Sequence, residues 1–132
     1  MRKYLFLFCV LLIVFSCNRV QRTDRISRDL KIAAEAVNKM SPFMVDSETR
    51  LDSAIPLPNN TLQYNYTLVN FTKDMIDVES FEAIMRPQIV NNVRTNPQME
   101  HPRKNNWTLI YVYKDKEGNH LVSITITPDD YR

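Results

Sequence analysis

The chain has 132 residues, with 17 basic and 15 acidic side chains and a formal net charge of +2. Such a balanced charge argues against nucleic-acid binding through a basic surface. The sequence holds a single glycine, whereas the phosphate-binding loops of P-loop and dinucleotide-binding proteins need several, so both classes are excluded.

The first predicted element is a signal peptide. Arg2 and Lys3 precede an apolar run from Leu5 to Phe15, and a basic start followed by roughly 7–15 apolar residues is typical of secretory signals. The run is too short for a membrane-spanning helix, which needs about 20 apolar residues. We therefore predict that residues 1–16 are a signal peptide and take no part in the fold.

The end of this run, Val14-Phe15-Ser16-Cys17, resembles the lipobox of bacterial lipoproteins, although Phe15 is bulkier than the commonest pattern allows. The resemblance implies cleavage before Cys17, alkylation of its thiol by a diacylglycerol and acylation of the new amine. Several acyl chains anchor a protein firmly, because each buried CH₂ contributes roughly 0.8 kcal/mol. The alternative is an ordinary secreted protein in which the cysteine occurs by chance.

The mature chain then consists of two parts: residues 17–22 form the lipidated cysteine and a polar tether, and residues 23–132 form a single α+β domain. It has no second cysteine for a disulfide, a thiolate nucleophile or a metal site, because Cys9 lies in the signal. Surface lipoproteins of the Bacteroidetes resemble one another in acidic residues after the cysteine. This tether carries arginines instead, which favours a lipid-anchored protein of the cell envelope that faces the periplasm.

An amphipathic helix is predicted next. Thr23 or Asp24 caps its start, and Pro42 after Ser41 ends it. Its apolar residues are separated by four, three, four and three positions, so they share one face. These residues are Ile26, Leu30, Ala33, Val37 and Met40.

A β-hairpin follows this helix in the prediction. Residues 49–55 form its first strand, and residues 56–60 hold the prolines and asparagines typical of a turn. Residues 62–68 alternate apolar and polar side chains and therefore form the second strand.

A second helix is predicted from near Asp77 to Asn96-Pro97. Pro87 inside it lacks the N–H that would bond to the carbonyl of Ala83, so we expect a kink or a split into two helices. One side of the helix carries the apolar residues Val78, Phe81, Met85, Ile89 and Val93.

The C-terminal hairpin has the clearest pattern, with strands over residues 107–113 and 120–127. Gly118 lies where the connecting turn needs a left-handed residue, and Asp115 would pair with Asn119. That pairing predicts three further pairs across a core face: Val112 with Val122, Ile110 with Ile124, and Thr108 with Ile126.

The order α-β-β-α-β-β predicts an α+β fold: a four-stranded antiparallel sheet with two helices packed on one face. The other face would be open and lined by aromatic side chains, and we interpret it as a possible binding face formed by Trp107, Tyr111 and Tyr113. Alternatively, the tether, Phe43-Met44 or a second copy of the domain covers that face, or the two faces are exchanged.

Groups that could carry chemistry are sparse. His101 and His120 have no partner at metal-ligand spacing, and no serine has a neighbouring glycine. Carboxylates such as Asp46 and Asp52 could act as acid and base only if they converged in a cleft. We therefore expect no catalytic residues, no metal and no cofactor.

The segment 42–53, followed by residues 64–68, resembles an uncharacterised family of small bacterial envelope proteins, over most of the mature chain. That resemblance supports an envelope location and assigns no activity. We interpret the chain as a non-enzymatic binding or assembly module, held at the membrane by its lipid, with a protein partner and no nucleic acid. The alternatives are a periplasmic inhibitor or immunity protein against an enzyme or toxin, and a hydrolase that uses Asp46 and Asp52.

Overall fold

A computed structural model describes residues 28–132 of the chain. The predicted signal peptide, Cys17 and the tether lie outside the described residues, as do the predicted caps Thr23 and Asp24 and the apolar Ile26. Within the part of the chain that the structure describes, no helix is both long and apolar enough to cross a membrane.

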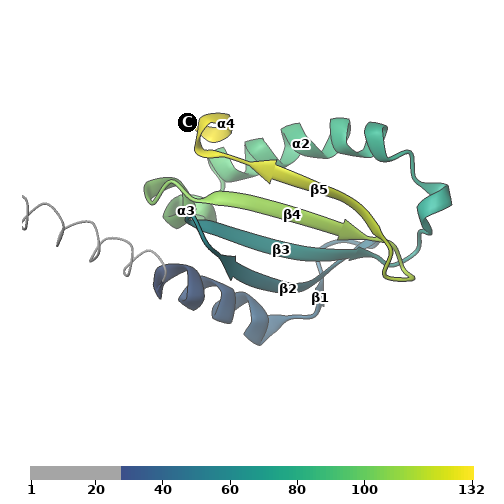
Figure 1. Ribbon diagram of the computed structural model, residues 1–132, viewed down its shortest axis with the longest axis horizontal. Helices are drawn as coiled ribbons and strands as arrows, with labels where there is room; N and C mark the ends of the chain where they lie inside the picture. The colour runs from purple at the N-terminus through teal and green to yellow at the C-terminus, as the bar shows by residue number, and fades with distance from the viewer. Residues whose placement is uncertain (1–27) are drawn as a thin grey trace, which may run out of the picture.

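The strands form one sheet, and the helices lie beside it (Figure 1). A helix over residues 28–40, here called the N-terminal helix, comes first. The later elements are, in chain order, β1 (Phe43–Met44), β2 (Thr49–Leu57), β3 (Thr61–Leu68), η1 (Lys73–Met75), α2 (Val78–Thr95), η2 (Pro97–Met99), α3 (Glu100–Lys104), β4 (Thr108–Lys114), β5 (His120–Ile126) and α4 (Pro128–Tyr131).

The sheet has five strands in the order β1-β2-β3-β4-β5, and β3 and β4 run parallel while the other neighbours are antiparallel. The prediction of a four-stranded, fully antiparallel sheet is therefore wrong in detail, although the α+β class is confirmed. The reason is the connection between the two hairpins. Because α2 returns the chain along the length of the sheet, β4 begins at the same end as β3, as in a β-α-β crossover.

The β4–β5 turn is the predicted one, but the register beyond it differs. Asp115 N–H donates to the carbonyl of Asn119 (2.9 Å), and Gly118 has a positive φ of 87°. A bulge then follows between Tyr113 and Lys114, and one extra residue in a strand reverses which side chains face inward. The observed pairs are Leu109 with Ile126, Tyr111 with Ile124, and Tyr113 with Val122, so the three predicted pairs are wrong by one residue.

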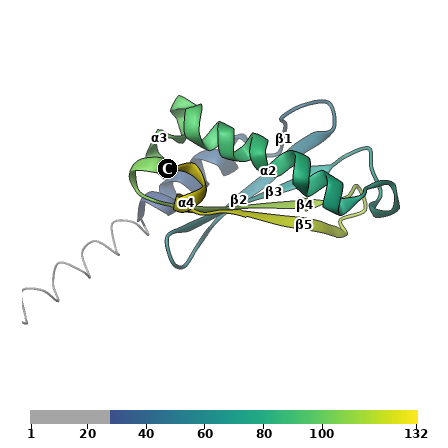
Figure 2. The ribbon, with the colours of Figure 1, turned by 90° about the horizontal axis from the view of Figure 1, so that it is seen from above.

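Both long helices cover the same face of the sheet (Figure 2). Leu30 and Ala34 of the N-terminal helix and Ile89 and Val93 of α2 are buried in the core together with the inward side chains of the strands. Asn38 fixes the N-terminal helix to β2, because its side-chain amide both donates to the carbonyl of Ala54 (2.9 Å) and accepts from its N–H (2.7 Å). The prediction of two helices on one face is therefore confirmed.

The apolar stripes of the two helices agree with the sequence pattern only in part. Val78, Phe81 and Met85 of α2 pack against the core, and α2 continues through Pro87 without the predicted split into two helices. In the N-terminal helix, Met40 is 66% exposed and is not a core residue. Its position near the end of the helix places it beyond the part that packs on β2.

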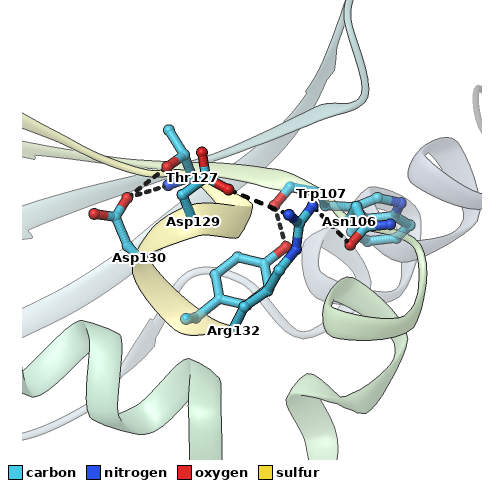
Figure 3. A network of polar contacts seen from close by, with 7 residues as sticks. Asn106, Trp107, Thr127, Asp129, Asp130 and Arg132 are labelled. Carbon is cyan, nitrogen blue, oxygen red and sulfur yellow. Dashed lines mark hydrogen bonds and ion pairs between the residues drawn. The ribbon is translucent and has the colours of Figure 1, made fainter.

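The C-terminus is fastened to the start of β4 by a small polar network (Figure 3). Thr127 and Asp130 form a capping box that begins α4, with the Asp130 carboxylate accepting from the Thr127 N–H (2.6 Å) and hydroxyl (2.7 Å). The buried Tyr131 hydroxyl donates to the carbonyl of Trp107 (2.7 Å), and Arg132 contacts the side chain of Asn106 (3.4 Å). These contacts close the core at the end of the sheet where Trp107 lies.

Candidate functional site

The aromatic residues selected from the sequence lie on the covered face of the sheet. Trp107, Tyr111 and Tyr113 are only 1%, 8% and 3% exposed, respectively. They do not form a free surface, so the prediction of an open aromatic face is wrong. The exchanged-face alternative holds for β4 only, because Val122, Ile124 and Ile126 of β5 are buried as predicted. The physical reason is the bulge before Lys114, which turns these side chains toward the helices.

The helices leave a groove of about 250 Å³ over part of this face. We call it the tyrosine groove. The sheet supplies its floor, α2 forms one wall, and the segment between β1 and β2 forms the other. Its lining residues are Val45, Asp46, Thr49, Tyr66, Met85, Gln88, Ile89, Asn92, Tyr111 and Tyr113. Two of the three residues selected from the sequence, Tyr111 and Tyr113, therefore belong to the groove, whereas Trp107 does not.

The three tyrosines that line the floor of the groove belong to a cluster of four tyrosines from two neighbouring strands. Parallel pairing sets Tyr64 beside Tyr111 and Tyr66 beside Tyr113. The corresponding ring centroids are 5.4 Å and 5.2 Å apart, and the rings of Tyr66 and Tyr111 stack with an interplanar angle of 6°. Phe81 of α2 packs edge-on against Tyr113 at 5.1 Å. Such contacts hold the rings in place and give the floor a defined shape.

The hydroxyl groups of this cluster remain available for a ligand. None of the four forms a hydrogen bond with another group of the described residues, in contrast to the hydroxyl of Tyr131. Burial raises the pKa of Tyr64 and of Tyr113 to about 12, the latter also through the nearby charge of Asp46. Burial also raises the pKa values of Tyr66 and Tyr111. The groove therefore presents neutral phenol groups that donate and accept hydrogen bonds at neutral pH.

The rim near β1 combines apolar side chains with one negative charge. Met44 and Val45 are about half exposed, at 49% and 54%. Asp46 turns the chain back toward β2, because its carboxylate accepts from the N–H groups of Glu48 and Thr49, both at 2.8 Å. The bond from Glu48 and then that from Thr49 lower the pKa of Asp46 against the opposing effect of burial. This carboxylate is therefore ionised at neutral pH and gives the groove a local preference for a basic group.

The two carboxylates of the hydrolase hypothesis do not converge. Asp46 lines the groove, whereas Asp52 lies on the opposite face of the sheet, where it pairs with Arg50 (2.6 Å) and accepts from the Thr67 hydroxyl (2.6 Å). A general acid and base must both reach the same substrate. The cleft that this hypothesis requires is therefore absent between Asp46 and Asp52.

The histidines lie apart from the groove and from each other. His101 packs edge-on against Trp107 (5.1 Å) and approaches Asp29 (3.8 Å), and His120 contacts the hydroxyl of Ser123 (2.9 Å). Within residues 28–132, no three side chains of the types that bind metals cluster closely enough to hold an ion.

Most of the residues that line the tyrosine groove are not predicted as site residues from the sequence. Tyr64 and Tyr66 were assigned to a strand but not to a site, and Gln88 and Asn92 lie on the exposed side of α2. A usable signal exists in the repeated spacing Tyr64-Asn65-Tyr66 and Tyr111-Val112-Tyr113, since alternate residues share one face of a strand. What the sequence lacks is the information that these two strands are neighbours.

Several solved structures share this fold. A Pseudomonas aeruginosa protein predicted to be secreted aligns with a TM-score of 0.70 at 13% identity, covering 84% of this chain and 96% of the other. EpsS, a pilotin of the Vibrio vulnificus type 2 secretion system, aligns with a TM-score of 0.67 at 6% identity, covering 85% and 96%. AspS, a type II secretion system pilotin of Vibrio cholerae, aligns with a TM-score of 0.66 at 8% identity, covering 85% and 97%. These likenesses show a shared fold.

The chain itself belongs to a protein family described as a domain of unknown function, DUF8479, which matches residues 24–122. This range includes both hairpins as far as Val122, α2 and every residue that lines the tyrosine groove. A search of curated proteins gave no match. The site must therefore be interpreted from its own geometry.

Proposed function

We propose that the protein is a membrane-anchored envelope lipoprotein that acts as a non-enzymatic binding or assembly module, with the tyrosine groove as the site for its protein partner. The observation that carries this proposal is the ordered tyrosine floor, whose hydroxyls make no hydrogen bonds within the described residues. A rigid aromatic surface with free polar groups is the kind of surface that protein interfaces use.

The groove suits a segment of a protein. Its lining is largely apolar, with a few polar groups that could orient a bound chain, and its rim continues into the exposed Phe43, Met44 and Val45. Amphipathic helices and extended segments bind such grooves through one row of apolar side chains. The ionised Asp46 favours a partner that carries a basic residue beside that row.

The similarity to two type II secretion pilotins supports an assembly role. Those proteins have the same fold over nearly all of their length, and both are named as pilotins of a type II secretion system. We propose that the present chain assists a protein complex of the envelope in a comparable way.

Anchoring follows from the lipobox-like sequence that ends at Cys17. Cys17→Ser should prevent lipid attachment and cleavage, so the variant should run as the uncleaved precursor and lose the lipid-dependent membrane fraction. Unchanged processing and fractionation would contradict the proposed anchor.

Photo-crosslinking in the native envelope tests the groove. Gln88 and Asn92 line it and are exposed, while their neighbour Asn91 on α2 is exposed but does not line it. A photoreactive residue at position 88 should give a discrete protein adduct, and the same residue at position 91 should not. Adding Asn92→Arg should remove the adduct from position 88 because the guanidinium obstructs the groove. Equal adducts at both positions, or none at position 88, would contradict the proposal.

An assembly role also predicts that the captured protein depends on this chain. Its level or its multimeric state in the envelope should fall when the chain is deleted and should recover with the wild-type protein but not with Asn92→Arg. Capture without this dependence would indicate binding alone.

A further inference from the structure

The N-terminal helix carries apolar side chains on its outer side as well as on its inner side. Leu30 and Ala34 are buried against the sheet, but Ile32 and Met40 are 59% and 66% exposed. These two side chains place aliphatic surface on the outer side of the helix, at the start of the described residues.

Positive charge surrounds these apolar side chains. Arg28, Lys31 and Lys39 are exposed, and none forms an ion pair with another described residue. Glu35 is the one acidic residue on the exposed side of the described helix, since Asp29 is partly buried and faces His101. The outer side of the helix therefore combines aliphatic groups with an excess of positive charge.

The sequence before the helix continues this pattern toward Cys17. Arg19, Arg22 and Arg25 precede the helix with Asp24 as their one acidic neighbour. Residues 18–27 can span at most roughly 35 Å even when fully extended. A lipid on Cys17 would therefore keep the start of the helix within roughly that distance of the bilayer surface.

We infer that the outer side of the N-terminal helix, with Lys31, Ile32, Lys39 and Met40, lies on an anionic phospholipid surface and gives the anchored domain one preferred orientation. Basic side chains near a membrane are attracted to anionic headgroups, and aliphatic side chains between them enter the interface. This inference rests on the lipid anchor of the proposed function and is independent of the partner at the groove.

The test uses the processed lipoprotein reconstituted into vesicles. The processed chain offers no other thiol, so Ile32→Cys and Ser123→Cys can each carry an environment-sensitive fluorophore. Ser123 is exposed on the opposite face of the sheet and serves as the control site. In vesicles of phosphatidylethanolamine and phosphatidylglycerol, the label at position 32 should shift to the blue and the label at position 123 should not. High salt or pure phosphatidylcholine should remove most of the shift, since screening weakens the attraction.

Charge-reversal variants add a matched comparison. Lys31→Glu/Lys39→Glu should lose more than half of the shift at position 32, whereas Lys114→Glu/Lys116→Glu, at the β4–β5 turn, should retain it. Vesicle flotation is measured for every variant to check the anchor separately. Equal shifts at positions 32 and 123, or equal effects of the two double variants, would overturn the inference while leaving the anchor intact. Failure of the wild-type protein to float would overturn the anchor and this inference together, and it would leave the crosslinking test of the groove unaffected.

Discussion

The two ends of the covered sheet face have the same alternation of side chains but different surroundings. At one end, Trp107 and Leu109 are almost completely buried, and the C-terminal Tyr131 closes the core over them. At the other end, Tyr111 and Tyr113 belong to the same strand and the same face, yet they form the floor of a groove. This difference shows that the elements packed over the sheet, rather than the pattern within the strand, decide whether an inward aromatic residue belongs to the core or to the tyrosine groove.

Trp107→Ala should have the largest effect on stability among the variants considered. Removal of a fully buried indole leaves a cavity, and such substitutions cost roughly 3–5 kcal/mol. Urea unfolding followed by circular dichroism measures the loss, with Trp107→Phe as a milder variant that keeps the protein measurable. A loss below about 1 kcal/mol would show that this end of the sheet is less tightly closed than described.

Alkaline pH should destabilise the groove end next. Burial raises the pKa of Tyr64 and Tyr113 to about 12, while tyrosines of the unfolded chain titrate near 10. The stabilising contribution of these protonated hydroxyls is complete below pH 10 and is lost as the pH rises toward 12, because only the unfolded chain releases the protons over that range. Absorbance at about 295 nm should show these tyrosines ionising together with unfolding. Reversible ionisation near pH 10 in the folded protein would contradict their burial.

Tyr131→Phe should cause a smaller loss at the closed end. The variant keeps the ring and removes the hydrogen bond to the Trp107 carbonyl (2.7 Å), which should cost about 1 kcal/mol. Thermal and urea unfolding measure this difference. An unchanged stability would indicate that water replaces the hydroxyl as the donor.

Tyr66→Phe and Tyr113→Phe should have the smallest effect on stability and a clear effect on binding. Because these hydroxyls make no hydrogen bond within the described residues, each substitution should change the free energy of unfolding by less than about 0.5 kcal/mol. The double variant should nevertheless weaken the crosslink from position 88. A stable variant with full crosslinking would show that the hydroxyls do not contact the partner.

How far the sequence predicts this molecule depends on the range of the interactions involved. The periodicity of residues 78–93 predicts the buried side of α2, and Asp115 with Gly118 predicts the β4–β5 turn, because both depend on near neighbours. The bulge beside Tyr113 and the parallel pairing of β3 with β4 depend on packing between distant segments. The bulge changes which side chains of β4 face inward, and the parallel pairing brings together tyrosines that are far apart in the sequence.

The parallel pairing of β3 and β4 also limits when the groove can exist. Tyr66 and Tyr113 become neighbours only after a crossover of about forty residues has closed, and contacts of such long range form slowly compared with a local hairpin. A fragment that contains only one of the two hairpins therefore lacks part of the floor. Competence of the proposed site to bind would arise only when both hairpins and the crossover between them have folded.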